Sequence, residues 1–94
     1  MYLEIISPEE TLFNGEIDSI SVPGSLGSFQ VLENHAPIVS SIDSGKVTIR
    51  GKFDSSKKYA NYFERLDENV LVFNISSGTI EVNKNRIILL SEKY

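Results

Sequence analysis

Hydrophobic and polar residues alternate in short stretches along most of the chain. Leu3 and Ile5 flank Glu4, and Val47 and Ile49 each lie between polar neighbours. A period of two is typical of strands that bury one face, because successive side chains of a strand point to opposite sides. Further short apolar stretches lie between turn signals: residues 17–22, 29–31, 38–42, 70–75, 80–82 and 87–90. The pattern predicts an all-β domain, a sandwich or barrel of short strands.

Three details of this pattern predict local geometry. Asn14-Gly15 is a common hairpin pair, and we expect the chain to turn there before the stretch at 17–22. Ile17 and Ile20 differ in parity, so this strand either contains a bulge or is covered on both faces. Lys84-Asn85 predicts a hairpin turn into the last strand.

Residues 53–68 are the exception to the strand pattern. Four apolar or aromatic side chains fall there at helical spacing (i, i+3, i+4, i+7), after Asp54 and Ser55 as candidate caps. These four are Tyr59, Tyr62, Phe63 and Leu66. The spacing predicts a short helix over 54–67. A long hairpin arm with aromatics on one face is the alternative, since Tyr and Phe also suit strands.

Composition agrees with a β domain. The chain of 94 residues contains 11 Ile, 7 Val and 3 Thr but only 2 Ala, a balance that favours strands over helices. A chain of this length builds one hydrophobic core. We therefore expect a single domain over residues 1–94.

Charge narrows the classes of partner. The net charge is −4; residues 1–45 contain seven acids and no Lys or Arg, whereas residues 46–94 contain nine bases and six acids. A chain of this balance is poorly suited to neutralising a phosphate backbone, so we expect no nucleic acid partner. The acidic first half suggests a face that meets a basic partner; chance placement of surface charges is the alternative.

The chain has no Cys and a single His, His35, which argues against disulfides, thiolate metal sites and His-pair metal sites. The longest apolar runs, Val70–Phe73 and Ile87–Leu90, are four residues long, far short of the roughly 20 that span a bilayer. The N-terminus lacks the basic and apolar regions of a secretory signal. We expect no metal and no cofactor, and a protein that stays in the cytoplasm.

Catalysis is poorly supported. His35 is the one candidate base, and none of the 13 Ser residues lies in a G-x-S-x-G motif. The glycines of Gly24-Ser25-Leu26-Gly27 are accounted for by a turn, because no phosphate-binding Lys follows them. Loops held by a rigid sheet often carry binding functions. The loops at 23–28 and 34–37 therefore favour contact with another protein.

These loops also carry a family resemblance. The chain reads L-x-I-x-x-P over residues 3–8, then F-x-G-x-I-x-x-I-x-V-P-G-x-x-G-x-F-x-V-L-x-x-H-A-P-I-V-S over 13–40, and S-G-x-I-E-V-x-x-N-x-I-x-L-L over 77–90. This sequence closely resembles the ε subunit of the F-type proton-translocating ATP synthase. The resemblance covers all but residues 51–69 in the body of the chain.

The resemblance implies a flattened ten-stranded β-sandwich in the central rotor stalk. Such a domain lies at the foot of the γ subunit and on the polar loops of the membrane c-ring, and contacts the α/β catalytic head only through γ. It would couple proton-driven rotation to ATP synthesis without chemistry of its own. The resemblance also implies a peripheral location at the cytoplasmic face of the bacterial plasma membrane.

In this family the turns at Pro23–Ser28 and Asn34–Pro37 are expected at the end of the sandwich that faces the ring, whose loops usually carry a basic residue. The implied ring-side contacts are Gly24, Ser25, Leu26, Gly27, Ser28, Glu33 and His35. Two roles remain open for His35: a polar contact to the ring or γ, or an imidazole that bonds a backbone group and fixes its own turn, which we favour.

The chain departs from the family pattern in three places. Many members continue into a two-helix C-terminal domain that inhibits ATP hydrolysis and in some bacteria binds ATP; here the sequence ends where that domain would begin. If this is the natural length, we expect those roles and nucleotide binding to be absent. The segment 51–69 is longer than the usual hairpin link. Ser77 occupies a position that often holds Gly, so a positive φ there would strain it.

A different class of function is a free-standing carbohydrate-binding sandwich. Tyr59, Tyr62 and Phe63 would then form an exposed stacking platform. A third is a hydrolase that uses a Ser beside His35. Neither accounts for the spacing of the P-G-x-x-G and H-A-P motifs.

Overall fold

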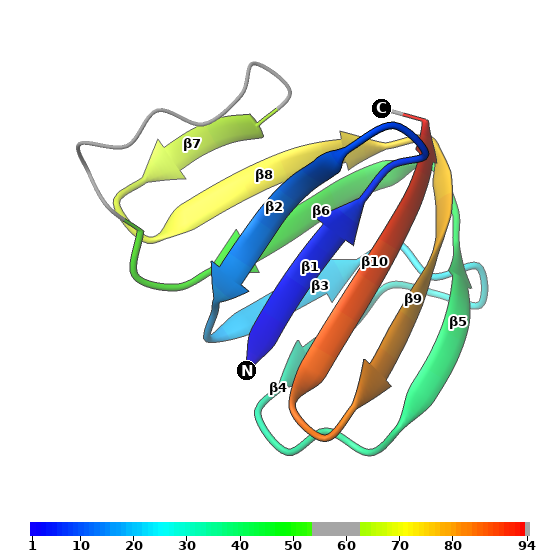
Figure 1. Ribbon diagram of the computed structural model, residues 1–94, viewed down its shortest axis with the longest axis horizontal. Helices are drawn as coiled ribbons and strands as arrows, with labels where there is room; N and C mark the ends of the chain where they lie inside the picture. Colours follow the sequence, from blue (N-terminus) through cyan, green and yellow to red (C-terminus); the bar gives the residue numbers. More distant parts are fainter. Residues whose placement is uncertain (54–62, 94) are drawn as a thin grey trace.

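The computed structural model describes residues 1–53 and 63–93. In this part of the chain ten strands form a β-sandwich, which confirms the predicted all-β fold (Figure 1). The strands are β1 (Tyr2–Ile6), β2 (Thr11–Glu16), β3 (Ser19–Val22), β4 (Phe29–Leu32), β5 (Ile38–Ile42), β6 (Gly45–Arg50), β7 (Phe63–Asp67), β8 (Val70–Ile75), β9 (Ser77–Asn83) and β10 (Arg86–Lys93).

Each layer of the sandwich is a five-stranded sheet. The first sheet has the order β2-β1-β10-β9-β5, and the second has the order β4-β3-β6-β8-β7. Neighbouring strands are antiparallel except β1 and β10, which pair in parallel from Tyr2↔Arg86 to Ile6↔Leu90. The first and last strands of the chain therefore lie side by side in the middle of one sheet.

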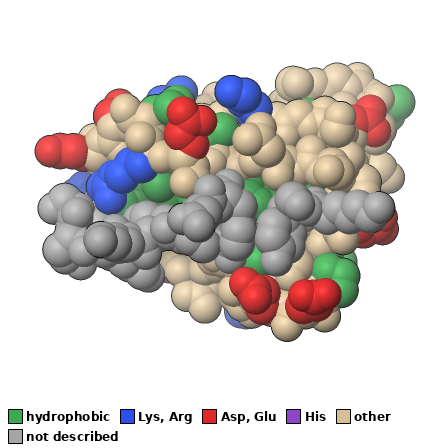
Figure 2. Space-filling view, turned by 90° about the horizontal axis from the view of Figure 1, so that it is seen from above, with side chains coloured by type: hydrophobic (Ala, Val, Ile, Leu, Met, Phe, Trp, Pro, Cys, Tyr) green, Lys and Arg blue, Asp and Glu red, His purple; other side chains and the backbone are tan. Residues whose placement is uncertain are grey.

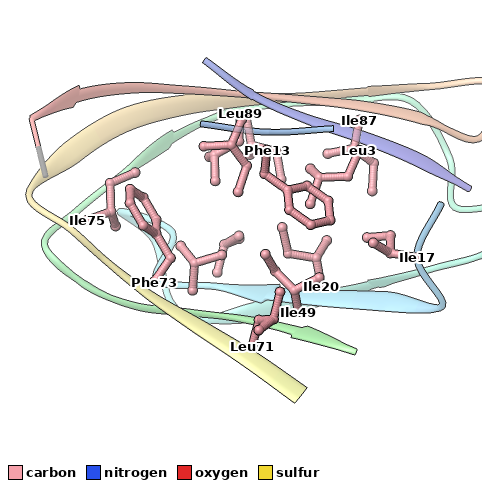
Figure 3. Close-up of a cluster of buried hydrophobic side chains, with 14 of the residues drawn as sticks. Leu3, Phe13, Ile17, Ile20, Ile49, Leu71, Phe73, Ile75, Ile87 and Leu89 are labelled. Carbon is pink, nitrogen blue, oxygen red and sulfur yellow. The ribbon is translucent and has the colours of Figure 1, made fainter. Parts of the chain in front are cut away.

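The inner faces of the two sheets enclose one hydrophobic core (Figure 3). Leu3 and Ile5 of β1 are completely buried, as predicted from their alternation with Glu4, and so are Val47 and Ile49 of β6. Burying one such side chain contributes about 1.5–3 kcal/mol relative to leaving it in water. Because both sheets supply apolar inner faces, neither is stable without the other.

The predicted turn at Asn14-Gly15 is wrong. Both residues lie inside β2, where Gly15 pairs with Leu3 of β1. The chain turns later, and there Ile17 N–H donates to the Met1 carbonyl at 2.9 Å while Asp18 N–H donates to the Arg50 carbonyl at 2.7 Å. Ile17 is therefore buried in a link before β3, which replaces both alternatives that its parity suggested.

The predicted helix is wrong for residues 63–67, which form β7 and pair with β8. Phe63 is buried against Phe73 with ring centroids 5.3 Å apart, whereas Leu66 is 59% exposed. Cross-strand pairing with an apolar neighbour outweighs a helical spacing of only four side chains. The remaining residues of the predicted helix, 54–62, lie outside the described residues.

The turn between β9 and β10 is the predicted hairpin. Lys84 and Asn85 have φ of 51° and 60°, the pair of positive values that a type I′ turn requires. Ser77 is not among the described residues with positive φ. It therefore does not carry the backbone strain that a glycine at this position would avoid. The neighbouring Gly78 is the constrained position, because a Cβ atom there would collide with the carbonyl oxygen of Leu90.

We expect Gly78→Ala to destabilise the domain by about 2 kcal/mol, because β9 would have to move away from β10. The measurement is the free energy of unfolding in urea. Ser77→Ala is the matched control on the adjacent residue and should stay within about 0.5 kcal/mol of the wild type. A Gly78→Ala protein as stable as this control would contradict the close approach of the two strands.

Candidate partner interface

The two turns singled out in the sequence lie at opposite ends of the sandwich. The Leu26 turn (residues 23–28) joins β3 to β4, and the His35 turn (residues 33–37) joins β4 to β5 (Figure 1). β5 begins directly after the His35 turn, whereas its last residue, Ile42, forms a bridge with Gly24. The five residues of β5 span roughly 17 Å, and this length separates the two turns.

The expectation that both turns face the ring from one end is therefore wrong. β4 is extended and antiparallel to β3, so it carries the chain from one end of the sandwich to the other between the two turns. Glu33 and His35 consequently lie at the opposite end from Ser25 and Leu26. The family resemblance had implied one shared end, but the extended β4 separates the two turns that it connects.

The Leu26 turn holds one apolar side chain in water on a rigid base. Ser25 N–H donates to the Ser41 carbonyl at 3.0 Å, and its hydroxyl donates to Asp43 Oδ1 at 2.9 Å. Gly27 N–H donates to the Gly24 carbonyl at 3.0 Å and closes the turn. Leu26 is fully exposed at its tip. An exposed leucine on a hydrogen-bonded turn is suited to insertion into a partner.

Of the five predicted contact residues in this turn, Gly24 is buried. A Cβ atom at Gly24 would lie 2.7 Å from the Phe29 ring and 2.8 Å from the Gly27 carbonyl oxygen. Gly27 has φ of 128°, which also favours glycine. Gly24 thus shapes the turn from within, and the side chains it leaves for contact are those of Ser25, Leu26 and Ser28, which are exposed.

Acidic side chains surround the Leu26 end. Ile6 pairs with Leu90, Leu90 with Thr79, and Thr79 with Ser41, so the turn after β1 and the end of β10 lie at the same end as the end of β5. The exposed carboxylates on these segments are Glu9, Glu10, Asp43 and Glu92. Figure 2 shows acidic side chains at several separate places on the face seen from above. The end therefore carries four exposed carboxylates and the exposed Lys46 at the start of β6.

The His35 turn is fastened to the β9–β10 hairpin by an amide clasp. Asn34 N–H donates to Asn85 Oδ1 at 2.6 Å, and Asn85 Nδ2 donates back to Asn34 Oδ1 at 3.0 Å. The His35 Nδ1 lies 2.6 Å from the Ala36 carbonyl oxygen, so this nitrogen carries the proton and donates. This contact confirms the expectation that the imidazole bonds a backbone group of its own turn.

The outer face of the first sheet carries an apolar row that sequence reasoning missed. What we call the apolar row consists of Ile6 of β1, Ile88 and Leu90 of β10, and Val39 of β5, with the exposed Glu81 of β9 between Val39 and Ile88. Val39 is 71% and Leu90 47% exposed. On the outer face of the second sheet, Lys46, Arg50 and Gln30 are exposed, together with Leu32 at 55%. The alternation of β1, β5 and β10 could have indicated these outward residues, but only the sheet order and register place them together.

The described residues offer little for chemistry. No group of three His, Cys, Asp or Glu side chains among them could hold a metal ion. The one imidazole is engaged with a backbone carbonyl rather than with a Ser hydroxyl. Phe63 is only 9% exposed, so it cannot serve in an exposed stacking platform, and Tyr59 and Tyr62 lie outside the described residues.

Residues 1–61 match the family described as ATP synthase, Delta/Epsilon chain, beta-sandwich domain. The chain is 36% identical to the ATP synthase epsilon chain of Chlorobaculum tepidum, over 97% of this chain and 88% of that protein. The chain belongs to the ATP synthase epsilon chain family. It is also 34% identical to the epsilon chain of Leptospira interrogans, of which it spans 59%, and 30% identical to that of Caulobacter vibrioides, of which it spans 90%.

Solved structures share the fold of this epsilon-type domain. One chain in the Tetrahymena thermophila mitochondrial ATP synthase central stalk and c-ring matches 98% of it with a TM-score of 0.72 and 13% identity. One in the Euglena gracilis mitochondrial ATP synthase matches 97% with a TM-score of 0.73 and 17% identity. The domain corresponds to 63% and 49% of those chains.

The amide clasp generates a stability prediction. Asn85→Ala removes both bonds to Asn34 and leaves a residue with a Cβ atom at φ of 60° without the amide that favours this conformation. We expect a loss of about 2 kcal/mol in the free energy of unfolding. Asn83→Ala, at an exposed position two residues earlier, is the control. Equal stability of the two variants would show that the clasp does not hold the His35 turn.

Proposed function

We propose that this domain is a non-catalytic subunit of the rotor stalk of an F-type ATP synthase, which links the γ subunit to the polar loops of the c-ring. Its role is to transmit rotation, while ATP is made elsewhere in the complex. Membership of the epsilon chain family carries this proposal. The shared fold with a chain in a structure of a central stalk and c-ring supports it.

The sandwich has the mechanical properties that such a role needs. Its core joins two sheets whose largest buried side chains are completely inaccessible to solvent. Close-packed interiors of this kind deform little, so a force applied at one surface moves the whole body. Backbone hydrogen bonds between residues 23–25 and 41–43 fix the Leu26 turn to the sandwich. Torque would therefore pass through the domain without being absorbed by its loops.

The Leu26 end is the side that we propose for the ring. It presents an apolar tip, with Ser25 and Ser28 beside it, at an end that also carries the exposed carboxylates of Glu9, Glu10, Asp43 and Glu92, which suit basic loops. Glu33 and His35 lie at the other end and are therefore left out of the ring contact. The outer face of the first sheet, with its apolar row, is the side that we propose for γ.

We further propose that the domain lies at the cytoplasmic face of the bacterial plasma membrane and is held there through its complex. In the described residues no helix is long and apolar enough to cross a membrane. Contact with the α/β catalytic head would be indirect, through γ.

The first experiment is binding of the purified protein to its cognate γ subunit, measured by calorimetry and gel filtration. We expect a complex of one copy of each. With γ shown to be folded, absence of binding at tens of micromolar protein would contradict the proposed function, because an affinity that weak could not hold a rotor together.

The second experiment concerns the ring. We expect Leu26→Ser to weaken binding of the preformed γ complex to isolated c-ring by about tenfold, because the apolar tip loses its contact area. Binding to γ should not change. Leu32→Ser is the control, since Leu32 is also exposed, at 55%, but lies at the end of β4 next to the His35 turn. If Leu32→Ser or His35→Gln weakens ring binding instead, the assignment of the two ends is reversed.

A further inference from the structure

β5 is an edge strand whose backbone is open at its first residues. It pairs with β9 on one side only. On the other side, the Ser41 carbonyl accepts from Ser25 N–H at 3.0 Å, so the backbone groups of Ser41 point away from β9. Alternate residues of an antiparallel strand direct their N–H and C=O to the same side. The N–H and C=O of Val39 therefore also point toward the open edge.

Among residues 1–53 and 63–93, a short segment covers the other end of this edge. Residues 23–25 run alongside residues 41–43, where the Asp43 N–H donates to the Pro23 carbonyl at 2.8 Å. Gly27 then turns the chain away, since its N–H bonds the Gly24 carbonyl. The backbone pairing along β5 thus stops before it reaches Val39.

The other three edges of the two sheets carry features that discourage pairing with a further strand. β2 contains a bulge where its register against β1 shifts, and it ends in Glu16. β7 carries Glu64, Arg65 and Asp67 and is also irregular against β8, and β4 is four residues long. β5 is one residue longer than β4 and, like β4, has no charged residue, Gly or Pro. An edge of this kind presents unpaired backbone groups that can pair with a strand of another chain.

The side chains around the open edge are suited to an added strand. Val39 is 71% exposed on the outer face. Beside it lies a shallow hollow of about 230 Å³. The hollow is lined by Pro37, Ile38, Val39, Glu81, Val82 and Asn83. In strand addition, main-chain hydrogen bonds supply affinity, and pockets for alternate side chains supply specificity.

We propose that an extended segment of the γ subunit pairs with β5 at Val39 and continues the first sheet as a sixth strand. The proposal rests on the proposed function, which makes γ the partner. Val39 lies on the same outer face as the surface that we propose for γ, with the exposed Glu81 of β9 between it and Ile88. γ would thus cover the apolar row and then bond the edge beside it.

The test uses Val39→Pro, which removes the outward N–H. The sheet itself should tolerate this change, because proline is accepted on edge strands where the N–H faces solvent. We expect γ binding to weaken by about tenfold or more, whereas Val39→Ala, which keeps the N–H, loses less. Leu66→Lys and Val39→Lys are a matched pair on the edges of the two sheets, and only the second should weaken binding.

Hydrogen exchange of the wild-type complex gives a second measurement that does not depend on how a variant folds. The Val39 amide should exchange rapidly in the free domain and slowly in the γ complex, whereas the Ser40 amide should be slow in both, because it points toward β9. Two results would overturn strand addition while leaving the proposed function intact. One is a wild-type complex with γ in which the Val39 amide stays unprotected. The other is a folded Val39→Pro variant that binds γ as tightly as the wild type does. If the wild type fails to bind γ, the proposed function falls first.

Discussion

The parallel pairing of β1 with β10 is the constraint on which the rest of the structure depends. It joins the first and last strands of the chain over five residue pairs and places both in the middle of the first sheet. Without it, β2 would have no link to β9 and β5, and Leu3 and Ile5 would lose the neighbours that complete their burial. The Glu4 carboxylate and the Arg86 guanidinium, 2.7 Å apart, lie across this pair, but an ion pair this exposed adds little to stability. Burial of the apolar side chains on the inner face contributes most of the stability of this pairing.

The same pairing creates the outer surface. Because β1 and β10 are in parallel register, Ile6 lies opposite Leu90 and Glu4 opposite Ile88. β9 and β5 extend these two rows to Ser41 and Val39. The places of the apolar side chains on this outer face are thus a consequence of how the core is closed.

The two ends of the sandwich are built for different tasks. At one end a short loop holds Leu26 away from the body, where an apolar side chain gains nothing from the fold itself. At the other end Asn34 and Asn85 are hydrogen-bonded to each other, and the His35 imidazole donates to the Ala36 carbonyl. The first end leaves the Leu26 side chain in solvent, whereas the second end uses its side chains to hold the crossing from one sheet to the other.

Much of the fold could be predicted because it depends on local alternation. Leu3, Ile5, Val47 and Ile49 were correctly placed in the core, since a strand with one buried face must show a period of two. The hairpin at Lys84-Asn85 and the type of surface loop at 23–28 were also visible in the sequence. The family resemblance added the sandwich and the stalk role, which alternation alone does not contain.

The tertiary structure decided what depends on neighbours distant in the sequence. Asn14-Gly15 became part of β2 because β1 offered a pairing partner, and residues 63–67 became a strand because β8 did. The candidate contact residues before and after β4 lie at opposite ends of the sandwich because an extended strand rises by roughly 3.3 Å per residue. The outward row and the open edge at Val39 arise only from register between strands. The sequence by itself determined which side chains had to be buried; the pairing of strands decided which of the others lie together on the surface, because hydrogen-bonded register is a property of two segments and not of one.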